Sequence, residues 1–395
     1  MKRVLFFVTA LLSVQSFAQC DGRYETEIFS SVSVTEVEYT DVYDWGVTDS
    51  GLDMDVYTPD GDTLSERPLI VFIHGGSFYL GNKDNLAMVD LCESFAKRGY
   101  VTASIQYRLT TVWNLTDSMH MLQTVMNGIS DAKAAIRYFR KDAATNGNAF
   151  GVDVNQVYVG GYSAGAIIAT NLAYINDTTS LPSYLLPIVN SIGGLEGNSG
   201  NSGYSSEVEA VVNIAGAVYK TSYIDADDVP IVSVHAADDT TVPYYCDNAM
   251  SNPLILEVCG SGTIHDVVAP LGIYNELHTF STGGHAAPVT QLASVSVPFI
   301  SDFLYTTLDC YEAVSVNEEE QFFEVYPNPV RESFVVREQS LLLEISLFDM
   351  MGRKVLSASA DGFEKQISVE GFDSGIYLLS IETEEGVEFQ KIFIE

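Results

Sequence analysis

Basic residues are scarce in this chain. Lysine and arginine together number 19, against 53 aspartate and glutamate residues, and the formal net charge is −34. A surface this acidic repels the phosphate backbone of nucleic acids and the headgroups of anionic lipids. The composition therefore excludes nucleic acid as a partner. The charge agrees both with work in an extracellular, even saline, medium and with simple solubility.

Long apolar runs are also missing, apart from one near the N-terminus. Two basic residues precede an apolar run over residues 4–14, and residues 16–18 (Ser-Phe-Ala) have the small-x-small pattern of a cleavage site. This run is too short to span a bilayer, and no later stretch is long enough either. The sequence therefore predicts a signal peptide over residues 1–18 and no stable membrane insertion.

Cysteine is limited to five residues. Cys246 and Cys259 lie 13 positions apart in a segment that contains turn residues, and they are the best candidates for a disulfide, which an exported protein can keep. Cys20 and Cys310 flank the larger predicted domain and could close it, whereas Cys92 lies in a helical apolar pattern and is predicted to be a buried free thiol. No cysteine and histidine spacing resembles a zinc site, so we expect neither a metal nor a cofactor.

Short β-branched runs alternate with helical patterns between about residues 35 and 305. This alternation predicts an α/β domain with a mostly parallel sheet flanked by helices. The predicted strands are Val34–Tyr39, Leu52–Tyr57, Leu69–Ile73, Val101–Gln106, Val157–Gly160, Ala210–Ile214, Ile231–His235 and Leu277–Phe280, and the predicted helices are Leu86–Arg98, Met119–Lys141, Ala164–Tyr174 and Val289–Tyr305. Residues 182–206 are rich in Gly, Asn and Ser and predict a flexible excursion, either a mobile cap or a surface loop.

The pattern changes after residue 311. A polar, charged stretch over residues 312–321 predicts a linker, which leaves residues 19–311 as the catalytic domain. Beyond it, short alternating strands predict a small all-β sandwich over residues 322–395 without catalytic residues. These strands are Phe334–Val336, Leu343–Phe348, Lys365–Val369, Ile376–Glu382 and Phe389–Ile394, with turns at 351–352, 361–362 and 373–375.

The strongest chemical signal is a G-x-S-x-G pentapeptide at residues 161–165, which lies between an apolar strand and an apolar helix. In this context the two glycines permit a turn so tight that side chains at their positions would clash. The turn exposes the hydroxyl of Ser163, and the N–H of Ala164 points to the same place near the start of a helix. The pattern predicts Ser163 as a nucleophile and Ala164 as a donor to an oxyanion.

A second glycine motif, His-Gly-Gly-Ser-Phe at residues 74–78, also follows an apolar strand. Glycine lets backbone N–H groups come close to the oxyanion of a tetrahedral intermediate. We therefore expect Gly76 and Ser77 to donate their N–H groups alongside Ala164, the alternative being an ordinary glycine turn. We expect His74 to be a structural hydrogen bonder and not the catalytic base.

The catalytic base should be a histidine that follows both the serine and an acid in the chain. His285, in a glycine loop after a predicted strand, fits best; His265 is the reserve candidate, and His278 alternates within a strand. Asp238 and Asp239 both come just past another strand, where a carboxylate can orient the imidazole and stabilise its protonated form. Their position in the sequence leaves the choice between them open.

Together these motifs resemble the carboxylesterases of the α/β-hydrolase superfamily that have a His-Gly-Gly-x-Phe oxyanion element. The resemblance rests on residues 74–78, 107–109, 131–138 and 161–165 and covers about 270 residues. In that group the acid lies in a His-Gly-x-x-Asp-x-x-Val-Pro pattern, which selects Asp239 here, although Ala236 replaces the usual glycine.

This resemblance implies a secreted serine carboxylic ester hydrolase with Ser163, Asp239 and His285 as its triad. Such an enzyme needs no cofactor, and its substrates would be esters, either acylated polysaccharides or small esters. The alternatives are a serine peptidase on the same fold and a catalytically inactive, exported binding protein.

The C-terminal region is similar to the sorting domain of the type IX secretion system of Bacteroidetes. The similarity rests on residues 325–329 (Val-Tyr-Pro-Asn-Pro), 347–353 and 375–378. It implies the type IX secretion machinery as a partner and a secreted or cell-surface location, reached through the signal peptide and outer-membrane secretion.

Overall fold

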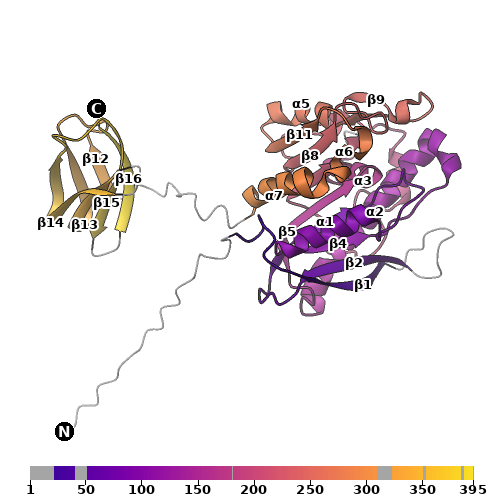
Figure 1. The fold of residues 1–395 in the computed structure, drawn as a ribbon, viewed down its shortest axis with the longest axis horizontal. Helices are drawn as coiled ribbons and strands as arrows, with labels where there is room; N and C mark the ends of the chain where they lie inside the picture. Colours follow the sequence, from indigo (N-terminus) through magenta and orange to yellow (C-terminus); the bar gives the residue numbers. More distant parts are fainter. Residues whose placement is uncertain are drawn as a thin grey trace, which may run out of the picture. The chain divides into compact units, whose positions relative to one another are not determined.

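The structure of the protein, a computed structural model, describes residues 22–40, 51–179, 181–308, 323–349, 353–383 and 387–394. The predicted signal peptide, Cys20, Cys310, the predicted linker and the predicted turn at 351–352 lie outside the described residues. The chain divides into two compact units, residues 1–314 and 315–395, and each is described by itself (Figure 1).

An eight-stranded mixed sheet forms the centre of the larger unit. Its strand order is β1-β2-β4-β3-β5-β6-β8-β11, in which β1 and β2 are antiparallel to their neighbours and the other strands run parallel. The strands are β1 (Val32–Thr40), β2 (Leu52–Pro59), β3 (Arg67–Ile73), β4 (Val101–Ile105), β5 (Val152–Tyr162), β6 (Ala210–Ile214), β8 (Ile231–Ala236) and β11 (Asn275–Phe280). All eight predicted strands of this sheet are confirmed. Those buried on both faces, such as β3, β4, β6 and β8, stand out in the sequence as apolar, β-branched runs.

Helices cover both faces of this sheet. Alternate residues of β3 point to opposite faces: Val71 belongs to a hydrophobic cluster that includes residues of α2, α3 and α5, and Phe72 belongs to a second cluster that includes residues of α1 and α7. The helices are α1 (Leu86–Lys97), α2 (Ser118–Thr145), α3 (Ala164–Tyr174), α5 (Ser261–Leu271) and α7 (Val297–Thr306). The predicted helix Val289–Tyr305 is instead three pieces, α6 (Ala287–Thr290), η5 (Leu292–Ser296) and α7. Pro298 is the second residue of α7, in the first helical turn that proline suits.

A small second sheet, absent from the predictions, has the order β7-β10-β9. Its strands β7 (Ala217–Val218), β9 (Cys246–Asn248) and β10 (Glu257–Gly260) are too short to give a periodic pattern.

The predicted disulfide between Cys246 and Cys259 is confirmed and joins opposite residues of β9 and β10. The short helices η1 (Val112–Thr116), η2 (Thr221–Tyr223), η3 (Ala249–Ser251) and η4 (Gly284–Ala286) lie in loops. Cys92 is a buried free thiol, as predicted.

Residues 182–206 are not the flexible excursion that their composition predicts. They begin with the short helix α4 (Leu186–Ser191), and the loop that follows packs against α2. The fully buried Ser199 donates from Oγ to Asp131 Oδ1 at 2.6 Å. Arg137 donates to two carbonyl oxygens of the loop at 2.7 and 3.0 Å. Buried polar contacts with α2 therefore fix this loop despite its glycines.

The smaller unit is all β, as predicted, in the form of one curled antiparallel sheet (Figure 1). Its strands are β12 (Phe323–Tyr326), β13 (Ser333–Phe348), β14 (Lys354–Ser368), β15 (Gly375–Thr383) and β16 (Val387–Ile394). The long β13 pairs with β12, β14 and β15 and replaces two separate predicted strands. The predicted turn at 361–362 lies inside β14, because shifts of register in the β13–β14 ladder absorb the irregular residues.

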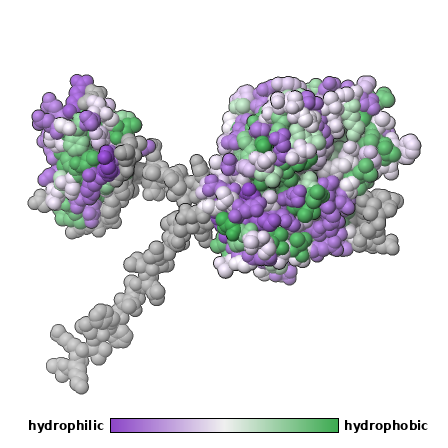
Figure 2. Space-filling model, in the orientation of Figure 1, coloured by the Kyte–Doolittle hydropathy of each residue, from purple (hydrophilic) through white to green (hydrophobic). Residues whose placement is uncertain are grey.

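The surface is mixed in character. On the face shown in Figure 2, hydrophilic and hydrophobic residues are interspersed over each unit. Among the residues that the structure describes, no helix is both long and apolar enough to cross a bilayer.

Candidate active site

Ser163 lies on the turn between β5 and α3. Its φ of 57° is in the left-handed region that side chains rarely adopt. A Cβ on Gly161 would come within 2.6 Å of the carbonyl oxygen of Ile73, and a Cβ on Gly165 would overlap the same oxygen. Both glycines are therefore required for the turn to pack against the end of β3. Ala164 occupies the first position of α3, where the backbone N–H has no acceptor within the helix.

The structure brings three predicted site residues into one hydrogen-bonded chain. His285 Nε2 lies 2.7 Å from Ser163 Oγ, and His285 Nδ1 lies 2.7 Å from Asp239 Oδ2. Since an ionised carboxylate can only accept hydrogen bonds, His285 Nδ1 carries the proton of the imidazole. Nε2 is then free to take the proton of the serine hydroxyl. This is the arrangement that a general base needs beside a nucleophile.

The carboxylate of Asp239 is fully buried and receives four hydrogen bonds. His235 Nε2, at 3.2 Å, is a second donor to Oδ2, while the N–H groups of Thr241 and Val242 donate to Oδ1 at 2.8 and 3.1 Å. Burial by itself raises the pKa of Asp239, but the bonds from His235 and His285 outweigh it and hold the pKa well below its usual range. The carboxylate is therefore ionised at neutral pH.

His235 was missed as a site residue by sequence reasoning, although it is part of the pattern that selects Asp239. It is fully buried, and its Nε2 also lies 3.0 Å from the carbonyl oxygen of Val242, so Nε2 carries the proton. Its Nδ1 then accepts from the hydroxyl of Ser261 at 2.8 Å. These contacts fix the tautomer of His235 as a donor to Asp239.

The neighbouring Asp238 has different contacts. Its carboxylate accepts the backbone N–H groups of Gly283 and Gly284 at 3.2 and 2.8 Å and so holds the loop that carries His285. Adjacent aspartates thus contact different parts of the same loop. Only Asp239 reaches the imidazole of His285.

Tyr162 also supports His285. Its ring stacks on the imidazole with centroids 5.1 Å apart, and its hydroxyl donates to the backbone carbonyl of His285 at 3.1 Å. Tyr162 occupies a variable position of the G-x-S-x-G pentapeptide, so no sequence signal marks it for this role.

The other candidate histidines lie elsewhere: His265 on α5 bonds Ser233 and Asn275, and His278 on β11 packs against phenylalanine rings.

The glycine motif at the end of β3 turns beside the nucleophile. Gly76 and Ser77 have φ values of 127° and 54°. Ser77 and Ala164 line the same small hollow as Ser163.

His74 is fully buried, donates from Nδ1 to the carbonyl oxygen of Gly75 at 2.7 Å and stacks on Tyr107. His74 therefore braces the loop and makes no contact with the hydrogen-bonded chain of the site.

Two family matches agree with this architecture. Residues 54–219 match the BD-FAE family, a range that contains β3, the glycine motif and Ser163. Residues 324–395 match the family described as secretion system C-terminal sorting domain. The larger unit is thus similar to this family over residues 54–219. The smaller unit is a secretion sorting domain, which indicates export through the type IX system.

Curated relatives resemble a limited part of the α/β-hydrolase unit. Gut esterase 1 of Caenorhabditis elegans is 29% identical over 116 residues, which are 29% of this chain and 20% of the relative. Carboxylesterase 3B of Mus musculus is 32% identical over 131 residues, which are 32% of this chain and 21% of the relative. The chain thus spans about a fifth of the length of these relatives.

Solved structures extend the similarity of the fold to the whole unit. A thermophilic esterase from Thermogutta terrifontis has a TM-score of 0.51 and 20% identity, over 72% of this chain and 95% of that one. A truncated carbohydrate esterase from gut microbiota has a TM-score of 0.51 and 20% identity, over 71% and 97%. At this identity the likeness concerns the α/β-hydrolase fold alone.

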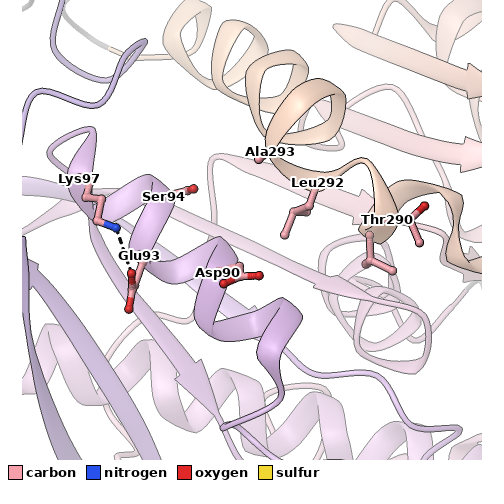
Figure 3. A pocket seen from close by; sticks show the side chains of 8 residues that line it. Asp90, Glu93, Ser94, Lys97, Thr290, Leu292 and Ala293 are labelled. Carbon is pink, nitrogen blue, oxygen red and sulfur yellow. Dashed lines mark hydrogen bonds and ion pairs between the residues drawn. The ribbon is translucent and has the colours of Figure 1, made fainter. Parts of the chain in front are cut away.

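A larger hollow of the hydrolase unit, about 400 Å³, lies away from Ser163 between α1 and the α6–η5 segment (Figure 3). Asp90, Glu93 and Lys97 line its α1 side, and Glu93 and Lys97 form an ion pair at 3.0 Å. Its other wall comes from residues 289–293. None of the residues that line it belongs to the hydrogen-bonded chain of Ser163, His285 and Asp239.

The buried His74 should make the stability of the hydrolase unit depend on pH. Burial lowers its pKa to about 4, so the fold favours the neutral imidazole, and the stabilisation is complete above the unfolded pKa of about 6.5. This stabilisation is lost as the pH falls from about 6.5 to about 4, and the free energy of unfolding decreases by about 3 kcal/mol in total. In His74→Phe we expect the difference in unfolding free energy between pH 7 and pH 4, measured by urea denaturation, to shrink by that amount. An unchanged pH dependence would contradict this role.

Proposed function

We propose that this protein is an exported serine carboxylic ester hydrolase in which Ser163, His285 and Asp239 act as a catalytic triad. The observation that carries the proposal is the continuous chain from Asp239 Oδ2 through His285 to Ser163 Oγ, with both links at 2.7 Å. The strained turn at Ser163 and the start of α3 beside it support the same assignment.

The reaction proceeds in two acyl-transfer steps. As Ser163 Oγ bonds to the carbonyl carbon of the ester, its proton passes to His285 Nε2, and the N–H groups of Gly76, Ser77 and Ala164 stabilise the oxyanion. The bond from carbon to the alcohol oxygen then breaks, and the alcohol takes the proton from Nε2. Water repeats the sequence on the acyl-enzyme, which releases the acid and restores Ser163. Asp239 keeps the imidazole in the required tautomer and stabilises its charged form.

The substrate is an ester met outside the cell, either an acyl group on a polysaccharide or a small soluble ester. Residues 1–18 act as the signal peptide, and the sorting domain passes the chain to the type IX machinery. The sorting-domain family and the names of the esterase relatives support this setting.

Labelling with a fluorophosphonate probe tests the proposal directly. We expect one probe per chain, attached to Ser163, with loss of hydrolysis of 4-nitrophenyl acetate in proportion to labelling. Absence of labelling in folded protein, with no hydrolysis, would favour an exported binding protein instead.

A further inference from the structure

An apolar hollow of about 60 Å³ opens beside Ser163. Its walls come from the glycine motif, from η1 and the start of α2, from α3, and from the segment between β8 and β10. The lining residues are Ser77, Phe78, Leu115, Met121, Ser163, Ala164, Ile167, Thr241, Val242, Ala249, Met250 and Ile255. Apart from Ser77, Ser163 and Thr241, these side chains are apolar.

The lining shows which part of an ester the hollow receives. A carbonyl carbon bonded to Ser163 Oγ directs its oxygen to the proposed oxyanion donors, so its acyl chain and its alcohol occupy the two remaining directions. The alcohol has to lie at His285 Nε2, which protonates it. The hollow is lined by Ser163, Ser77 and Ala164 but not by His285. It therefore lies on the side of the acyl chain.

We propose that this hollow is the acyl subsite and that it selects esters of short, unbranched acids, from acetyl to hexanoyl. The inference rests on the proposed function and narrows it. A water-sized group needs roughly 10–15 Å³ of such space, so the hollow has room for about four to six of them. A hexanoyl chain, with five carbons beyond its carbonyl carbon, fits within this room. An octanoyl chain, with seven, exceeds it, and so does an aromatic acyl group such as the feruloyl group of plant polysaccharides.

The wall of the hollow that α2 and α3 form belongs to the packed core. Met121 on α2 and Ile167 on α3 are only 6% and 8% exposed and lie in the same hydrophobic cluster. Close-packed side chains of this kind resist displacement by a larger ligand. On the opposite wall Ala249 has the smallest side chain, and the backbone around it is tied to Leu256 by a hydrogen bond of 3.1 Å. Size at positions 121 and 249 therefore sets the acyl length.

The test compares kcat/KM for 4-nitrophenyl acetate, butyrate, hexanoate and octanoate, and for methyl ferulate. For the wild type we expect a fall of at least about tenfold between hexanoate and octanoate. Ala249→Leu fills the hollow and should lower the butyrate-to-acetate ratio by about tenfold, whereas Met121→Ala enlarges it and should raise the octanoate-to-hexanoate ratio by a similar factor. Circular dichroism melts establish that each variant is folded.

The outcomes separate this inference from the proposed function. Hydrolysis of octanoate or ferulate as efficient as that of acetate, dependent on Ser163, would overturn the short acyl subsite and leave the esterase intact. Unchanged ratios in both folded variants would do the same. Failure to hydrolyse every ester, or hydrolysis that survives Ser163→Ala, would overturn the esterase proposal itself.

Discussion

Ser163→Ala is expected to lower kcat/KM for 4-nitrophenyl acetate by about 10⁵- to 10⁶-fold, because the variant has no oxygen to form the acyl-enzyme. The side chain loses one atom and keeps its Cβ, so the strained backbone at φ 57° remains as it is. The melting temperature should therefore stay within the error of the wild-type value. Steady-state kinetics and a calorimetric melt of the same preparation check both expectations.

A matched control is the same substitution at a buried serine outside the site. Ser301 on α7 is fully buried and donates to the carbonyl oxygen of Tyr24 at 2.7 Å, far along the chain from the proposed triad. Ser301→Ala should reduce stability slightly and leave kcat/KM within about twofold of the wild type. Equal losses of activity in the two variants would show that the effect of Ser163→Ala comes from unfolding and not from the loss of a nucleophile.

Asp239→Asn is expected to reduce kcat by about 10⁴-fold with little change in KM. Asp239 Oδ2 accepts the Nδ1 proton of His285 at 2.7 Å, and this fixes the tautomer whose Nε2 can take the serine proton. An amide can present N–H to Nδ1 instead, which moves the imidazole proton to Nε2 and blocks the acceptor. The loss should be largest in the acylation step, measured by a pre-steady-state burst.

The neighbouring residue provides the control for this second prediction. Asp238→Asn removes the same charge one position earlier, but that side chain bonds only to the N–H groups of the loop, where an amide oxygen can replace one carboxylate oxygen. We expect a loss of no more than about tenfold, mainly from a less ordered loop. The reverse ranking of the two variants would assign the triad acid to Asp238.

Much of the hydrolase unit could be predicted from the sequence. Buried parallel strands and the helices that cover them carry strong hydrophobic patterns, and the eight strands of the large sheet follow from those patterns. The sheet β7-β10-β9 and the helix α5 could not be predicted, because strands of two to four residues have no period and glycine and serine at the end of β10 indicate a turn. The loop over residues 193–206 has the composition of a flexible segment, yet contacts with Asp131 and Arg137 on a distant helix fix it.

The sequence by itself determined the turn at Ser163, since two glycines and a serine between a strand and a helix specify that geometry through local steric constraints. It also marked the disulfide pair and the all-β C-terminal unit. The family pattern selected Asp239 over Asp238, and the structure places Asp239 beside His285. Only the tertiary structure decided that Tyr162 and His235 support the imidazole and the carboxylate, and how large the hollow beside Ser163 is. These features depend on distances between residues that are more than 100 positions apart in the chain, such as the 123 positions between Tyr162 and His285, and the packing of the sheet and its helices sets those distances.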